Sequence, residues 1–186
     1  MGAFLRDITL NEAGQVLGLL LSAVGFFIYS AKTRRGILSA KLICDVGYAV
    51  QNFMIGAPTG ALINLISVAR ELVFYRRGSK RWASHRIWLY LFVALMGFAP
   101  LITWMGIVSL LPSIGSAVAV FAFYCREPHH TRIIGIFSMI PWLIYCVVIP
   151  NYGVFLTTVV QLVAAVFGLI RDHREKRRRE GKRNKN

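Results

Sequence analysis

Long stretches without a single charged residue are the feature that most constrains this chain. Four stretches contain no Lys, Arg, Asp or Glu and together make up most of the sequence: residues 13–31, 46–69, 88–125 and 133–170. A helix that crosses a bilayer needs about 20 mostly apolar residues. The last two stretches are each too long for one crossing and fit two. The sequence therefore predicts a protein that crosses a membrane several times.

Turn signals divide the apolar segments into seven predicted helices. The segment 37–76 fits two crossings around GAPTG at 56–60, where Gly and Pro favour a turn. The seven predicted spans are 13–31, 37–55, 59–76, 87–102, 107–125, 133–149 and 153–170. The expected fold class is an all-α polytopic membrane protein with a single transmembrane domain over residues 1–172.

The charged residues predict how the chain crosses the membrane. Of the 22 Lys and Arg, 20 fall in or next to the segments after the first, third, fifth and seventh spans, and the opposite loops carry none. Cytoplasmic loops collect Lys and Arg. We therefore expect an N-terminus outside the cytoplasm and a basic cytoplasmic tail over residues 173–186.

The net charge of +14 would also be compatible with a nucleic-acid-binding protein. However, only 16% of the residues are charged and 56% are hydrophobic. A basic segment directly after a span is attracted to anionic lipid. The expected partner of the tail is therefore the lipid bilayer, and no nucleic acid is expected.

An offset of 93 residues aligns the two parts of the chain in spacing and hydropathy. Gly60 then meets Gly153, and each opens the third helix of its part. This alignment predicts two parallel three-helix repeats, residues 13–76 and 107–170, joined by a linker helix over 87–102. In transporters built from parallel repeats, the substrate site lies at the repeat interface near the middle of the membrane.

Polar side chains recur at helical spacing inside several predicted spans. Polar groups are costly within a bilayer and therefore face a partner or a water-filled cavity. We predict a site for a small polar or amphiphilic molecule. The candidate substrate-binding residues are Asn52, Asn64, Ser67, Trp142, Tyr145, Thr157 and Gln161. Hydrogen bonding between helices is the alternative for the hydroxyl groups.

Four charged residues interrupt the second and third spans. Lys41 and Asp45 lie in the second span, and Arg70 and Glu71 lie in the third. A charge at the centre of a membrane helix costs about 2.5–3.5 kcal/mol on insertion scales, so each needs a partner. We predict the ion pairs Asp45–Arg70 and Lys41–Glu71. They would form either a structural clamp or part of a gate or proton relay.

Enzyme and cofactor signatures are absent from the sequence. Cys44, Cys125 and Cys146 are scattered without C-x-x-C spacing and favour neither a disulfide framework nor a metal site. The chain contains no H-E-x-x-H, Walker, G-x-S-x-G or G-x-G-x-x-G motif. We expect no enzyme activity, no metal and no cofactor. Gly14 and Gly18 form a G-x-x-x-G motif that favours close helix packing, and a homo-oligomer is left open.

Two segments carry a resemblance to a known family. SAVGFFIYSAKTRRGILSAKL and GAPTGALINLISVARELVFY resemble the YgjV family of bacterial inner-membrane proteins, and the likeness extends over about residues 12–172. Its most specific part is the Gly turn followed by a helix with Asn64, Ser67 and Arg70. The resemblance implies a multispanning protein of the bacterial inner membrane.

The 3+1+3 plan looks like that of SWEET sugar transporters, PQ-loop proteins, the KDEL receptor and PnuC-type vitamin transporters. In SWEETs, Asn on the third helix and an aromatic residue on the second helix of each half bind substrate. Asn64 and Trp142 match these roles, whereas Thr157 stands where a second Asn would be. The resemblance implies a small-molecule transporter or facilitator. The alternative is a receptor or assembly factor on the same scaffold.

Overall fold

The computed structural model describes residues 2–104 and 106–183, most of which are helical. The described residues form seven long helices: α1 (Gly2–Ser30), α2 (Arg34–Met54), α3 (Pro58–Arg76), α4 (Ile87–Ile102), α5 (Leu110–Tyr124), α6 (Pro128–Val148) and α7 (Tyr152–Arg183). Two short 3-10 helices, η1 (Trp82–Ser84) and η2 (Ile107–Ser109), flank α4. The seven helices follow the order of the predicted spans and confirm the all-helical fold.

The residues between helices explain where several helices begin. Thr33 has an extended backbone, and its hydroxyl accepts a hydrogen bond from the Gly36 amide at 3.1 Å, which caps the start of α2. Pro58 and Pro128 stand in the first turns of α3 and α6, where a helix does not need their missing N–H. Gly56 has a φ of +71°, a conformation that glycine adopts easily, and it forms the predicted turn before α3.

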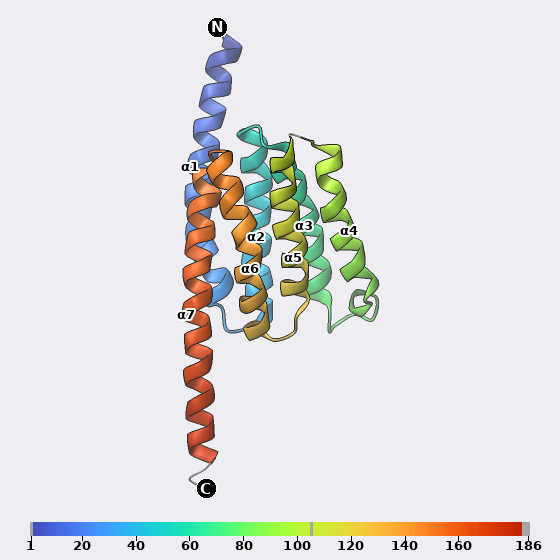
Figure 1. The fold of residues 1–186 in the computed structure, drawn as a ribbon, viewed down its shortest axis with the longest axis vertical. Coiled ribbons are helices and arrows are strands. Elements are labelled where there is room, and N and C mark those ends of the chain that lie inside the picture. Colours follow the sequence, from blue (N-terminus) through green and yellow to red (C-terminus); the bar gives the residue numbers. More distant parts are fainter. Residues whose placement is uncertain (1, 105, 184–186) are drawn as a thin grey trace.

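Six of the helices form a closed ring. α1 packs against α2 and α7, α2 packs against α3, and α6 packs against α5 and α7. Contacts between α3 and α5 complete the ring, while α4 lies outside it against α3 and α5 (Figure 1). Successive helices run in opposite directions, so α1–α3 and α5–α7 have matching directions. We call α1–α3 the N-terminal half and α5–α7 the C-terminal half.

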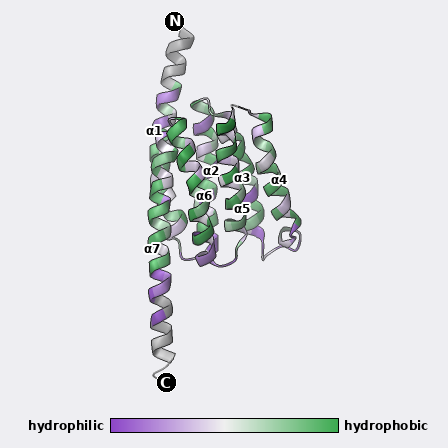
Figure 2. Ribbon diagram, viewed as in Figure 1, coloured by the Kyte–Doolittle hydropathy of each residue, from purple (hydrophilic) through white to green (hydrophobic). Residues whose placement is uncertain are grey.

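The faces of the helices are sorted with apolar groups outside and polar groups inside. On α2, the Phe53 side chain is 80% exposed, whereas Asp45 and Asn52 are completely buried. Among the described residues, stretches in α1, η2–α5, α6 and α7 are long and apolar enough to cross a membrane, and α4 is a shorter apolar helix. α2 and α3 are less apolar on average because they bury polar faces inside the ring (Figure 2). A membrane protein is expected to have this distribution.

Two glycines allow α1 and α7 to approach closely. A Cβ atom placed on Gly18 would lie 2.9 Å from the Cα of Gly153, and one placed on Gly153 would lie 2.5 Å from the Cα of Gly18. Real side chains do not tolerate such distances. The G-x-x-x-G motif therefore contributes to close packing within the chain, with Gly18 at the crossing of α1 and α7.

Arginines of the C-terminal half cap the end of α1. Arg132 of α6 is 1% exposed, and its Nε and Nη2 donate hydrogen bonds of 2.9 Å to the carbonyl oxygens of Tyr29 and Ala31. Its Nη1 donates to the carboxylate of Asp172. Arg171 of α7 donates to the carbonyl of Ser30 at 3.1 Å. These cationic donors satisfy carbonyl groups that a helix end leaves without intrahelical partners.

Arginines of the N-terminal half, to which we count Arg77 directly after α3, cap the end of α5 in return. Arg34 donates from Nε to the carbonyl of Cys125 at 2.9 Å and from Nη2 to that of Phe123 at 3.3 Å. Arg77 donates to the carbonyl of Tyr124, and its guanidinium lies 3.4 Å above the centre of the same ring. Each half therefore supplies two arginines to the first helix of the other half.

Arg34 lies close to other cations at this end of the bundle. Burial, followed by the positive charges of Arg77 and Arg126, lowers the pKa of Arg34 to about 10. Because this value is still well above neutral pH, the guanidinium remains charged. It keeps its strength as a donor to the end of α5.

Candidate functional site

A small cavity lies inside the ring of helices. Its volume is about 60 Å³, and one water molecule needs about 10–15 Å³. α1, α2, α3, α5, α6 and α7 all contribute side chains to its wall. The cavity therefore lies between the N-terminal and C-terminal halves and has room for a few waters or a very small solute.

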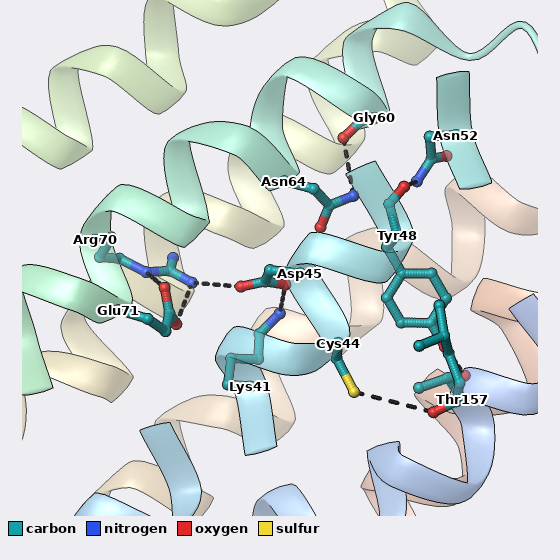
Figure 3. A network of polar contacts seen from close by, with 11 residues as sticks. Lys41, Cys44, Asp45, Tyr48, Asn52, Gly60, Asn64, Arg70, Glu71 and Thr157 are labelled. Atoms are coloured by element: carbon teal, nitrogen blue, oxygen red, sulfur yellow. Dashed lines mark hydrogen bonds and ion pairs between the residues drawn. The ribbon is translucent and has the colours of Figure 1, made fainter. Parts of the chain in front are cut away.

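Five of the seven candidate substrate-binding residues line this cavity: Asn64, Ser67, Trp142, Thr157 and Gln161. Asn64 also donates from Nδ2 to the carbonyl of Gly60 one turn earlier, at 2.9 Å (Figure 3). That bond uses Nδ2 and fixes the orientation of the amide. The side-chain oxygen Oδ1 takes no part in it. Helical spacing on α3, α6 and α7 was the signal that identified these five residues.

The remaining uncharged polar lining comes from residues that were not among the candidates: Tyr29, Tyr48, Ser116, Ser138 and Thr158. Tyr48 links two helices because its hydroxyl hydrogen-bonds with that of Thr157 on α7. It lies on one face of α2 with Asp45 and Asn52, so the spacing of polar residues carried a signal for it. No comparable sequence pattern marked Tyr29.

Asn52 lies outside the cavity wall, contrary to its expected place in the site. Its Oδ1 accepts a hydrogen bond of 3.1 Å from Asn151, and its Nδ2 donates to the carbonyl of Tyr48. Asn151 also accepts a 2.9 Å bond from Gln51 and a 3.1 Å bond from the Val154 amide at the start of α7. All three amide side chains are completely buried. Asn52 thus belongs to an amide network, formed by Gln51, Asn52 and Asn151, that ties α2 to α7.

Tyr145 is likewise not part of the cavity wall. It is 1% exposed, and its ring packs edge-on against Trp142 with 5.8 Å between ring centres. Its hydroxyl is buried and has no hydrogen-bond partner within the described part of the chain. In this arrangement Tyr145 supports Trp142 from behind instead of facing the cavity.

A cluster of four charged residues borders the cavity on the side of α2 and α3. Arg70 lies between two carboxylates (Figure 3). Its Nε and Nη2 donate to Glu71 at 3.1 and 2.8 Å, and Nη2 lies 3.8 Å from Oδ2 of Asp45. Lys41 contacts the other oxygen of Asp45. The contact between Asp45 and Arg70 corresponds to the predicted pair between α2 and α3.

The predicted Lys41–Glu71 pair is wrong. Lys41 pairs with Asp45, which lies four residues later and therefore one turn away on the same face of α2. Glu71 pairs with the guanidinium of its neighbour Arg70. Both short-range partners lie within reach without any displacement of the helices, so they replace the expected contact between α2 and α3.

The charges in this cluster are not equally placed around the cavity. Lys41 and Arg70 are the charged residues in its wall, whereas Asp45 and Glu71 are not part of the wall. The ring of Phe123 lies against both cations, 5.1 Å from the Arg70 guanidinium carbon and 6.0 Å from the Lys41 nitrogen. A cation above an aromatic face is attracted by it. The cavity therefore has a cationic end.

Metal coordination has no support among the described residues. They contain no group of three or more His, Cys, Asp or Glu side chains placed to hold a metal ion. Cys44, Cys125 and Cys146 are free thiols. The chemistry available at the cavity is therefore that of hydrogen bonds, two cations and aromatic surfaces.

Comparison with known families decides what kind of protein carries this cavity. The model of a family described as bacterial inner membrane protein, Imp-YgjV, matches residues 12–176. The chain belongs to this family. It is therefore a protein of the bacterial inner membrane, in agreement with the apolar outer surface of the helices. Neither the search of curated proteins nor the search of solved structures found a match.

Proposed function

We propose that this inner-membrane protein is a transporter or facilitator for a small polar or amphiphilic molecule and not an enzyme. The observation that carries the proposal is a cavity between six helices of a membrane-embedded bundle, with polar side chains in its wall. Polar groups are costly in such a position, and they mark substrate or ion pathways in many membrane proteins. A 3+1+3 architecture like that of SWEET and PnuC-type transporters is part of the same proposal.

Alternating access would come from movement of one half against the other. Matched helix directions in the two halves and the reciprocal arginine caps support a parallel repeat with α4 as its linker. The cap of Tyr29, Ser30 and Ala31 corresponds to that of Phe123, Tyr124 and Cys125 within one residue of the predicted offset. In transporters with parallel repeats, the two halves rock about a fixed central site.

The proposed orientation has the N-terminus outside and the C-terminal tail in the cytoplasm. The loop after α1, the loop with η1 and the loop after α5 lie at one end of the bundle, where α7 also leaves it (Figure 2). Most of the basic residues of the chain lie in or next to these segments, and positive charge collects on the cytoplasmic side. Fusion of a reporter that is active on only one side of the membrane tests this orientation.

Labelling from water tests whether the cavity is accessible. In a background without the three native cysteines, Asn64→Cys and Gln161→Cys should react with a charged maleimide. Leu65→Cys is the matched control because Leu65 follows Asn64 but is 59% exposed on the outer, lipid-facing surface. A charged reagent should leave it unmodified. Failure of both cavity positions to react would count against a transport pathway.

Flux measurements test transport itself. Purified protein in sealed vesicles should accelerate the uptake of at least one small solute from a panel of carboxylates, amides, sugars, nucleosides and vitamins. The double variant Asn64→Ala/Gln161→Ala should lose this flux while it still inserts and folds. Saturable binding of a solute without any flux would favour a receptor on the same scaffold.

A further inference from the structure

Arg70 has a hydrogen-bond donor that no other described residue uses. The side chain is 1% exposed, and Glu71 occupies its Nε and Nη2. Its Nη1 is buried and has no hydrogen-bond partner among the residues that the structure describes. A buried donor on a charged group is costly to leave without a partner. Arg70 is also part of the cavity wall, which places its guanidinium beside any molecule that the cavity holds.

The charges facing the cavity favour an acceptor with negative charge. The cluster of Lys41, Asp45, Arg70 and Glu71 is neutral in sum, but its two cations form part of the cavity wall and its carboxylates do not. A guanidinium keeps its charge under all ordinary conditions. Its planar fork suits the oxygens of a carboxylate, and such charge-assisted bonds are stronger than neutral ones.

The dimensions of the cavity limit the size of the acceptor. A volume of about 60 Å³ is well below the roughly 300–1,000 Å³ of sites for drug-sized ligands. A sugar or a vitamin does not fit this conformation of the protein. A carboxylate with one or two further carbon atoms fits much better, and its hydrocarbon part would face the apolar lining, which includes Met139 and Trp142.

We propose that the cavity binds a small monocarboxylate, with its oxygens on Nη1 of Arg70. This inference rests on the proposed transport function and specifies the substrate class of the same site. Lys41 adds a second positive charge to the cationic end of the cavity, and Phe123 holds both cations in place. Arg70 is thereby the anchor of the ligand as well as a member of the ion cluster.

Thermal unfolding of the purified protein in detergent tests the proposal with sodium acetate as the probe. A ligand that binds the folded state raises the unfolding temperature in proportion to RT ln(1 + [L]/Kd). Acetate should raise it relative to sodium chloride at the same ionic strength and pH. Acetamide has a similar shape but no charge, and it should give a shift much smaller than that of acetate.

Two variants should change acetate affinity in opposite directions. Glu71→Gln removes the competing carboxylate and should tighten acetate binding several-fold. Arg70→Gln/Glu71→Gln removes the pair together, which keeps the cluster neutral, and should weaken binding by about tenfold or more. Arg81→Gln is the control because Arg81 is exposed in the loop with η1, and acetate affinity should not change. A role of Arg70 in folding alone would not produce opposite changes.

Two outcomes would overturn the proposal. One is the absence of any stabilisation by acetate beyond that of chloride. The other is equal stabilisation of the wild type and of Arg70→Gln/Glu71→Gln. Failure of the proposed function gives a different pattern: acetate binds through Arg70, but no solute crosses sealed vesicles. Flux of an uncharged solute without acetate binding would overturn only the present inference.

Discussion

The two ends of the helical ring are held together by different chemistry. At the basic end, four arginines donate to backbone carbonyls across the boundary between the halves. At the opposite end, the amide network of Gln51, Asn52 and Asn151 ties α2 to α7 without any formal charge. At both ends, hydrogen bonds connect the N-terminal half to the C-terminal half, but only the bonds at the basic end have charged donors.

This difference shows that some basic residues of the chain have a structural role in addition to predicting the cytoplasmic side. A count of Lys and Arg indicates only which side of the membrane a loop occupies. Four of these residues instead hold helix ends, and hydrogen bonds to charged groups contribute about 1.5–3 kcal/mol each, against about 1 kcal/mol for neutral ones. The opposite end lacks such charges in its loops and uses buried amides, whose bonds are insensitive to salt.

The largest loss of stability should follow from Arg132→Met, which removes the most buried of the four capping arginines at the basic end. The change leaves two carbonyls and Asp172 without their donor. Loss of one partner of a buried pair costs about 3–5 kcal/mol, and we expect a reduction near the lower limit. Chemical denaturation of the purified protein measures it. Arg174→Met, at an exposed position of α7, should change stability by less than about 0.5 kcal/mol.

A smaller effect should follow from Asn151→Ala at the opposite end. The substitution removes three hydrogen bonds and leaves the Gln51 amide and the Asn52 carbonyl oxygen buried without partners. We expect a loss of about 2–3 kcal/mol in the same denaturation experiment. Tyr152→Ala in the next position, which is 66% exposed, serves as the control and should have little effect. A loss no larger than that of the control would show that the network does not hold this end.

The smallest effect should follow from Arg171→Gln, and salt should distinguish it from the change at the opposite end. Arg171 makes one bond of 3.1 Å to the Ser30 carbonyl and is partly exposed. We expect a loss of about 1 kcal/mol that decreases in 1 M NaCl, where screening acts within about 3 Å. The loss caused by Asn151→Ala should stay constant. Equal salt dependence of both variants would contradict the difference between the two ends.

The sequence predicted the positions of the helices well because charged residues and turn signals mark where each uncharged segment begins and ends. The third span was expected over 59–76, and α3 comprises Pro58–Arg76. The lengths of the first and last helices were underestimated. α1 begins at Gly2 and α7 continues to Arg183, because a helix can extend through polar residues that hydropathy assigns to the membrane surface.

The candidate site was predicted in part. Helical spacing identified which polar residues share a face, and five of the candidates line the cavity. Spacing does not determine which residue of a neighbouring helix lies opposite. Asn52 therefore meets Asn151, which lies just before α7, and Lys41 finds its partner on its own helix. The signal for Asn151 was its place just before a helix, where Asn commonly caps the first turn.

The arginine caps have a consequence for the order in which the protein can be completed. The carbonyls of Tyr29, Ser30 and Ala31 accept from residues that follow them by more than 100 positions. During synthesis, α1 and α2 therefore emerge before the arginines that cap the end of α1 have been made. Arg34 likewise has no α5 carbonyl to bind at that stage. The first helix of the chain reaches its final state only when the last helix has been inserted.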